Sequence, residues 1–111
     1  MTHMTEYIII VTACAHKKEA ETIAHILLKD RVVACATITE GVASHFWWKG
    51  SLDSADEVLL ITKTIVSQFP YVEARIKEHH SYEVPEIVAF PIMCGSQEYL
   101  QWITESLTKE G

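Results

Sequence analysis

The chain has 111 residues, of which 49% are hydrophobic and 22% charged, and its formal net charge at pH 7 is −6. This length fits a single domain spanning residues 1–111, and the apolar content excludes a disordered chain. Because acidic residues outnumber basic ones and no stripe of Lys or Arg occurs, we expect neither nucleic acid nor an anionic membrane as a partner.

Nothing in the sequence pattern indicates export or insertion into a membrane. The amino-terminal residues lack a basic segment followed by an apolar core, and no apolar run is long enough to span a bilayer. The three cysteines, Cys14, Cys35 and Cys94, suit neither a disulfide framework nor a Cys-x-x-Cys zinc site. Cys35 lies in an apolar strand pattern and Cys94 in a turn, so both are expected to be structural. We therefore expect a cytoplasmic protein with reduced thiols.

The first half of the chain predicts a strand, a helix and a long extended segment. Tyr7 to Ala13 is apolar and β-branched, which predicts a strand. Lys17 to Lys29 repeats apolar residues at helical spacing and predicts a helix. Arg31 to Thr39 predicts a strand, and Ser44 to Lys49 continues extended with bulky aromatic residues until Gly50 turns the chain. The two extended segments together predict one long, bent strand.

The second half predicts two further strands, each followed by a helix. Glu57 to Ile65 is apolar on both faces near its middle, which predicts a strand. From Ser67 the apolar residues recur at helical spacing as far as the His79-His80 pair, so these histidines close a second helix. Pro85 to Met93 predicts a fourth strand, and a last helix begins near Ser96.

The order β-α-β-β-α-β-α matches the split β-α-β, ferredoxin-like arrangement with an added C-terminal helix. In this fold class the helices cover one face of an antiparallel sheet, and the other face is left open. Leu59 and Ile61, or the residues that alternate with them, would then face water. We therefore expect this face to pack against copies of the same chain.

The stretch from His79 to Ile87 gathers two imidazoles, a phenol and two carboxylates. His80 with Glu83 and Glu86 offers nitrogen and oxygen donors to a metal. A thiolate from Cys14, which precedes a helix start, would favour copper or zinc. The alternative is that the histidines merely end a helix, where a positive charge suits the helix dipole. Because no nucleophile has a base at readable spacing, the stretch favours binding over catalysis.

A second candidate site is a cleft for a small ligand. Trp47, Trp48 and Tyr82 predict an aromatic wall, and Lys63 ends an apolar strand face where it could pair with Glu83 or with an anion. The alternative is that the aromatic side chains pack in an interface between subunits.

Several short segments, each weak alone, occur together in a specific order and spacing: Arg31-Val32-Val33-Ala34-Cys35, Trp48-Lys49-Gly50, Glu57 with Lys63-Thr64, His80 to Ile87, and Tyr99-Leu100-Gln101-Trp102. Through them the chain resembles the CutA divalent-cation-tolerance proteins, small trimers of ferredoxin-like subunits, over roughly Ile8 to Trp102. The resemblance implies a trimer that binds divalent metal, copper above all. The chain departs from the family pattern at Ser81, where proline is usual, and at Thr37, where asparagine is usual. Ser81 leaves the loop that carries Tyr82 and Glu83 freer to move.

Residues and resemblance together predict a cytoplasmic homotrimer that is not an enzyme. It would bind a divalent metal, Cu(II) first, and contribute to metal tolerance or signalling through an unidentified protein partner. One rival is a trimeric sensor similar to the nitrogen-regulatory trimers, which takes a small anion through Lys63 and binds metal incidentally. A second is a small hydrolase or isomerase that uses His80 and Glu83 as acid and base. Copper could also bind at the amino terminus through His3, provided that Met1 remains.

Overall fold

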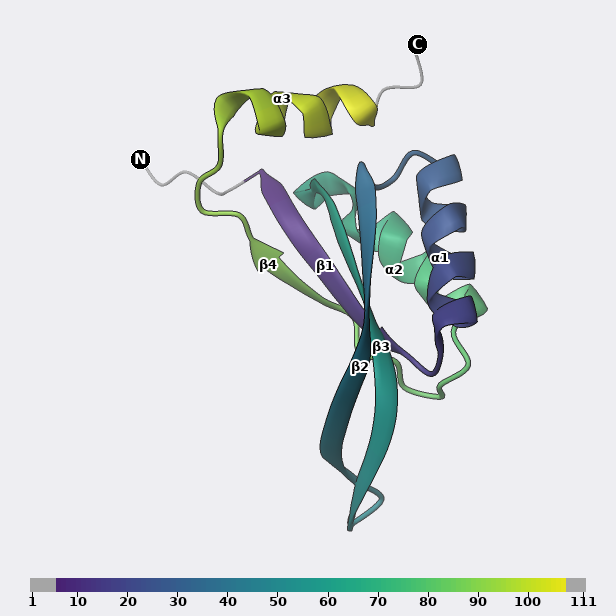
Figure 1. Ribbon diagram of the computed structural model, residues 1–111. Coiled ribbons are helices and arrows are strands. Elements are labelled where there is room, and N and C mark those ends of the chain that lie inside the picture. The colour runs from purple at the N-terminus through teal and green to yellow at the C-terminus, as the bar shows by residue number, and fades with distance from the viewer. Residues whose placement is uncertain (1–5, 108–111) are drawn as a thin grey trace.

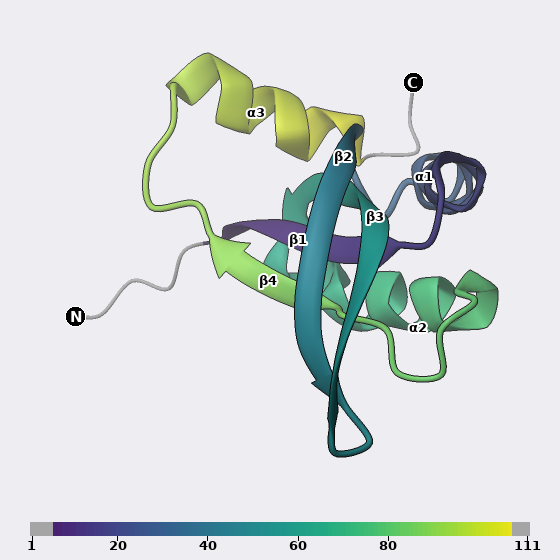
Figure 2. The same cartoon turned by 60° about the horizontal axis from the view of Figure 1, so that its bottom comes forward.

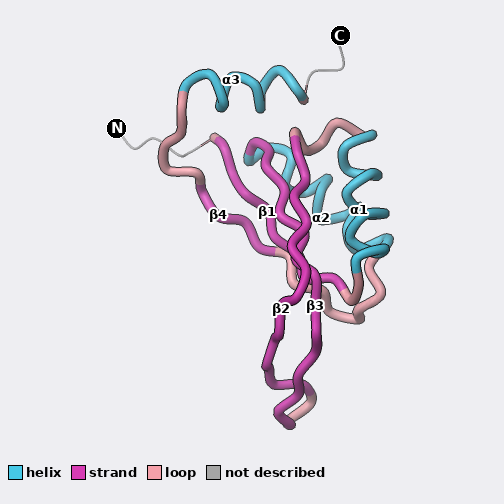
Figure 3. The backbone as a smooth tube through the Cα atoms, viewed as in Figure 1, coloured by secondary structure: helices cyan, strands magenta, loops and turns pink. Residues whose placement is uncertain are grey.

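The computed structural model describes residues 6–107, which form a four-stranded antiparallel sheet with strand order β2-β3-β1-β4 and three α-helices (Figures 1 and 3). The elements are β1 (Tyr7–Cys14), α1 (Lys17–Lys29), β2 (Cys35–Trp48), β3 (Ser51–Ile65), a short 3-10 helix (Val66–Gln68), α2 (Phe69–His79), β4 (Val88–Pro91) and α3 (Gln97–Ser106). The predicted order of elements and the ferredoxin-like class are confirmed.

The core lies between the sheet and the pair α1 and α2. Along β3, Leu60, Thr62 and Thr64 are buried, while the residues between them are only half-buried, as the alternation of a strand with two different faces requires. The helices contribute their apolar stripes to this side, including Leu27 of α1 and Ile76 of α2. The sheet therefore has one face closed by helices and one face that α1 and α2 do not touch.

The second strand begins later than its hydrophobic pattern predicts. Residues 31–34 form a turn instead of a strand, because Arg31 adopts a left-handed conformation with φ of 59° after the end of α1. The backbone N–H of Val32 then donates to the carbonyl oxygen of Leu27, which closes the helix end. Regular pairing of β2 with β3 starts at Cys35, opposite Lys63.

The third strand begins at Ser51, six residues before the predicted start at Glu57. Lys49 and Gly50 both have positive φ, 49° and 84°, which is the geometry of a tight two-residue hairpin turn that suits twisted strands. The turn pairs Trp48 with Ser51, and the ladder continues through the polar residues that follow. The sequence did not predict this part of the strand because most of its residues are polar and they show no apolar alternation.

The paired ends of β2 and β3 form a hairpin arm, residues 42–57, that projects beyond the rest of the sheet (Figure 1). A register shift between Thr39 and Val42 bends β2 at the base of the arm, and Gly41, with φ of 74°, occupies the shift. The expectation of one long, bent strand is confirmed by this geometry.

The fourth strand is shorter than predicted, Val88–Pro91 in place of Pro85 to Met93. It pairs with only four residues of β1, from Val88 opposite Val11 to Pro91 opposite Ile8. Residues 80–87 form a loop, because they have left the helix and have not yet reached β1. This loop carries most of the polar residues that the sequence singles out.

Helix α3 lies apart from α1 and α2 (Figure 2). Its Ile103 is fully buried, and Tyr99 contacts Lys63 on the sheet face that α1 and α2 leave open. Ser96 caps the helix by accepting a hydrogen bond from the backbone N–H of Tyr99. Leu59 and Ile61 on the same face are half-buried. Within residues 6–107, no helix combines the length and the apolar character needed to cross a bilayer.

Candidate metal centre and adjoining pocket

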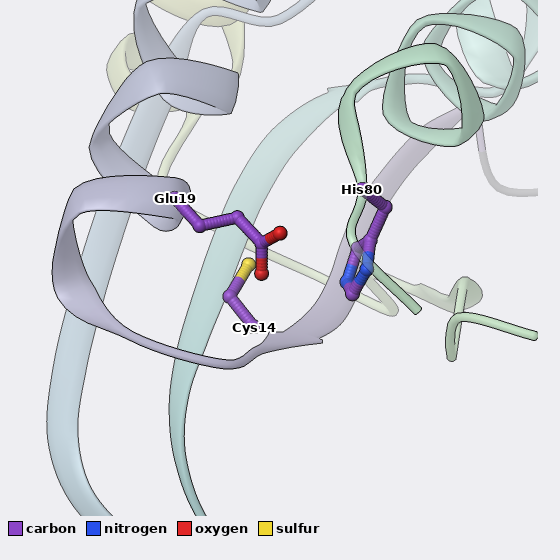
Figure 4. A group of neighbouring side chains, drawn as sticks. All are labelled: Cys14, Glu19 and His80. Carbon is purple, nitrogen blue, oxygen red and sulfur yellow. The ribbon is translucent and has the colours of Figure 1, made fainter. Parts of the chain in front are cut away.

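Three potential metal ligands meet where β1 ends, α1 begins and α2 ends (Figure 4). The sulfur of Cys14, a carboxylate oxygen of Glu19 and a ring nitrogen of His80 all lie within 4.8 Å of one another. Among the residues that the structure describes, no other group of three His, Cys, Asp or Glu side chains is arranged in this way.

Glu19 is held in place by the first turn of α1. His16 caps this helix, because its Nδ1 accepts a hydrogen bond from the backbone N–H of Glu19 over 3.2 Å. The Glu19 side chain reaches back in the manner of a capping box and accepts from the backbone N–H of Ala15 over 2.9 Å. Its second oxygen accepts from the backbone N–H of Ser81 over 2.7 Å. One carboxylate thus joins the β1–α1 turn to the loop after α2.

The same hydrogen bonds decide the charge of Glu19. Burial opposes ionisation of this carboxyl, but the bonds from Ala15 and Ser81 outweigh that effect, so its pKa lies below the ordinary value. The carboxylate is therefore charged at neutral pH, although the residue is only 9% exposed.

Both ring nitrogens of His80 already have backbone partners. Nε2 lies 2.8 Å from the carbonyl oxygen of Ala13, which can only accept, so Nε2 carries the proton. Nδ1 accepts from the backbone N–H of Tyr82 over 3.1 Å. This pattern assigns the neutral imidazole, and the ring also packs against Tyr82 at a centroid distance of 4.8 Å.

Cys14 is fully buried as the last residue of β1. Burial, followed by the nearby charges of Glu19 and Glu57, raises the pKa of this thiol to about 12. The sequence suggested that the position before α1 would favour a thiolate. That expectation is wrong for the free protein, because the loss of solvent around the sulfur outweighs the helix terminus.

The donor set suits a borderline metal such as copper or zinc, since it combines sulfur, nitrogen and carboxylate oxygen. Two of its members must change state before they can coordinate. Cys14 must lose its proton, and the His80 ring must give up either the Ala13 carbonyl or the Tyr82 amide. The cluster therefore fits a metal ion in composition and spacing. Without the ion, hydrogen bonds hold the Glu19 and His80 side chains in place.

The structure thus brings together two of the four metal ligands expected from the sequence, Cys14 and His80. The other two, Glu83 and Glu86, are exposed and line a pocket beside the cluster. Glu19 was missed. Its spacing of three residues from His16 at a helix start was the available signal, but that spacing indicates a cap as readily as a ligand.

The pocket, of about 840 Å³, lies between the hairpin arm and the loop of residues 80–87. Trp47 and Trp48 line it from the arm and Tyr82 from the loop, as the predicted aromatic wall requires. Its titratable lining consists of one histidine, one phenol and four carboxylates: His45, Tyr82, Asp53, Glu57, Glu83 and Glu86. Because no Lys or Arg lines it, the pocket attracts cations and repels anions.

Lys63 lies away from this pocket. Its ammonium nitrogen is 3.9 Å from the sulfur of Cys35 and 5.9 Å from the ring centroid of Tyr99, beneath α3. The three residues come together because Cys35 and Lys63 are directly opposite in the β2–β3 ladder. The expected pairing of Lys63 with Glu83 is absent from the ion pairs within residues 6–107. The amino-terminal His3 site lies outside the described residues.

Known proteins are similar to this chain in both fold and sequence. The family model described as CutA1 divalent ion tolerance protein matches residues 8–106. The "Divalent-cation tolerance protein CutA" of Thermus thermophilus is 40% identical over 101 residues, which cover 91% of this chain and 97% of that protein. A crystal structure of CutA from Xylella fastidiosa has a TM-score of 0.90 at 29% identity and covers 94% of this chain and 100% of its own.

A third match comes from Archaeoglobus fulgidus. The structure of its protein, described as a periplasmic divalent cation tolerance protein CutA, has a TM-score of 0.89 at 37% identity. It covers 92% of this chain and 99% of its own. The arrangement of strands and helices is thus common to proteins from distant sources.

Proposed function

We propose that this chain, which belongs to the CutA1 divalent ion tolerance family, binds divalent cations and thereby contributes to divalent cation tolerance. The observation that carries the proposal is the cluster of Cys14, Glu19 and His80, whose ligand atoms lie within 4.8 Å of one another. Among divalent ions we propose Cu(II) as the preferred one, because nitrogen and sulfur donors bind it more tightly than Mn(II) or Ni(II).

Glu83 and Glu86 are the candidates to complete the ligand set. They follow His80 in an exposed loop. At position 81 the chain has Ser81 in place of the proline usual in the family, so φ is not fixed there and the loop can shift toward the cluster. Glu19 needs no such movement, because each of its oxygens keeps a free lone pair beside its hydrogen bond. Copper held there would supply a fixed positive charge to an otherwise acidic region.

We further propose that the protein acts as a cytoplasmic homotrimer and without catalysis. The open sheet face carries the half-buried Leu59 and Ile61, and large apolar side chains such as Phe90 and Met93 are exposed nearby on the β4 side. Faces of this kind are covered by association between subunits in many small proteins. The three cysteines are free, which suits a reducing compartment.

The proposed site is tested by copper titration calorimetry on full-length protein. His80→Ala and Cys14→Ser should each weaken copper binding on the order of tenfold or more, because each removes one ligand. His79→Ala is the matched control, since His79 is the exposed neighbour of His80 and lies outside the cluster. Binding by His79→Ala should equal that of the unchanged protein.

A protein shortened by residues 1–3 separates this site from accidental copper binding at the amino terminus. The shortened protein should keep its copper affinity. If copper binding disappears in the shortened protein and survives His80→Ala, the cluster is not the site, and the proposal fails.

A further inference from the structure

Glu57 is a nearly buried carboxylate without a positive partner. It is 8% exposed, and its one hydrogen bond comes from the hydroxyl of Tyr82, which donates to Oε2 over 2.7 Å. Within residues 6–107 no Lys, Arg or His pairs with it, and Oε1 accepts no hydrogen bond. Oε1 is not among the buried atoms that lack a partner, and Glu57 lines the adjoining pocket, so this oxygen is accessible from the pocket and can accept a hydrogen bond from a cation there.

The space beside Glu57 has the size of an organic molecule. The pocket of about 840 Å³ falls within the range of small-molecule sites and far exceeds the volume of a single metal ion. Its acidic residues also lack the convergence that a metal needs, because the group of three ligands found within residues 6–107 lies at Cys14, outside the lining.

The walls of the pocket suit a cation that carries an apolar body. Trp47 and Trp48 are among its lining residues, and indole rings attract ammonium groups through their negative faces and cover apolar carbon. The chain itself supplies one such contact, since the ammonium of Lys49 lies 5.5 Å from the centroid of the Trp48 ring. Glu83 and Glu86 add negative charge at the rim.

We propose that this pocket binds a small organic cation whose primary ammonium group donates to Glu57 and whose apolar body rests against Trp47 and Trp48. The Tyr82 hydroxyl fixes the carboxylate by holding Oε2, which leaves Oε1 for the ligand. The site shares Glu83 and Glu86 with the proposed metal centre but not Glu57, Trp47 or Trp48, and Cys14, Glu19 and His80 lie outside its lining. Because the test below is made without metal, either proposal can fail alone.

The test follows tryptophan emission in a Trp102→Phe background, in which only the two pocket indoles remain of the three tryptophans. The full chain, kept metal-free with a chelator, is titrated with benzylamine, benzyl alcohol and benzoate. These probes share one aromatic body and differ in charge. Benzylamine should bind, and the uncharged alcohol should bind on the order of tenfold more weakly because it lacks the charge-assisted hydrogen bond. Benzoate should not bind.

Glu57→Gln keeps the size of the side chain and the bond from Tyr82 while removing the charge. It should weaken benzylamine on the order of tenfold and leave benzyl alcohol unchanged. Asp56→Asn is the matched control, because Asp56 is adjacent, exposed and outside the pocket lining, and it should bind benzylamine normally. If Glu57→Gln does not fold, the exposed pair Glu83→Gln and Glu86→Gln replaces it, with a smaller loss expected.

Three results would overturn the proposal. Equal binding of benzylamine and benzyl alcohol would make the pocket merely apolar. Unchanged benzylamine affinity in Glu57→Gln, or in the replacement pair, would show that these carboxylates do not bind the ammonium group. No response to any probe, in a protein whose pocket aromatics are shielded from a soluble quencher, would mean that a second copy of the chain fills the space.

Discussion

Nε2 of His80 donates a hydrogen bond to the carbonyl oxygen of Ala13 across 67 positions of sequence, over 2.8 Å. This contact fixes the end of α2 against the end of β1 and brings His80 beside Cys14. The imidazole therefore has a structural role in the free protein that is independent of any metal. The proposed metal centre is built on contacts that also hold the fold together.

The first prediction concerns the stability cost of His80→Ala. The change leaves the Ala13 carbonyl and the Tyr82 amide without their partners, so it should lower the free energy of unfolding by about 1 to 3 kcal/mol. Urea denaturation at fixed protein concentration measures the loss. His79→Ala should cost less than about 0.5 kcal/mol, because surface changes away from such contacts are small. Equal stability of the two variants would show that the ring is not anchored.

The second prediction concerns acid stability through Glu19. Its pKa in the folded protein lies below the ordinary value of 4.5, so it contributes stability above the unfolded pKa that is lost as the pH falls through the folded pKa. Glu19→Gln should be less stable than the unchanged protein at neutral pH, and it should lose less stability on acidification. Denaturation curves at neutral and acid pH give the comparison, and parallel losses in both proteins would contradict it.

The third prediction concerns alkaline stability through Cys14. Burial raises the pKa of this thiol from 9.0 to about 12, so the stability it contributes is present below pH 9.0 and is lost as the pH rises toward about 12. Cys14→Ala should flatten this alkaline loss. In the folded protein a thiol reagent should modify the exposed Cys94 rapidly and Cys14 only after unfolding. Rapid modification of Cys14 under native conditions would disprove its burial.

The fourth prediction concerns the proton dependence of copper binding. Because Cys14 must release a proton and the His80 imidazole must stay neutral, copper affinity should fall as the pH falls. Proton release on binding is measured by calorimetry in buffers of different ionisation enthalpy. Cu(II) should bind more tightly than Ni(II), and Ni(II) more tightly than Mn(II). An affinity that does not vary with pH would point to an all-oxygen site away from the cluster.

The fifth prediction concerns self-association. If the open sheet face meets other subunits, Leu59→Lys and Ile61→Lys should each place a charge in that interface and dissociate the assembly. Sedimentation velocity measures the mass of the assembly, and circular dichroism shows whether the variant is still folded. Thr22→Lys is the control, since Thr22 is exposed on α1, the helix that covers the opposite face of the sheet. Should both leucine and isoleucine variants remain folded trimers, the interface lies elsewhere.

Apolar periodicity was sufficient to predict the order of the elements, because the core is built from strands and helices with regular apolar faces. It was insufficient for residues 51–56 of β3, which have no apolar alternation and are mostly exposed along the hairpin arm. The site was predicted in part. The motif around His80 lies beside Cys14 as expected, whereas Glu19 joined the cluster through helix capping. Within one chain Lys63 lies beside Cys35 and outside the pocket that holds Tyr82, and a strand pattern does not reveal which residues of distant loops come near it.

The length of the hairpin arm has a consequence for motion. Residues 42–57 pair with each other beyond the reach of β1, and a two-stranded ribbon of this kind is marginal in water without a third layer. The arm should therefore open and close as a unit while the remaining sheet stays intact, and its amide protons should exchange faster than those of β1. A molecule that fills the space between the arm and the loop of residues 80–87 would slow that exchange. Binding in the pocket would therefore reduce the opening motion of the whole arm, including residues far from the pocket.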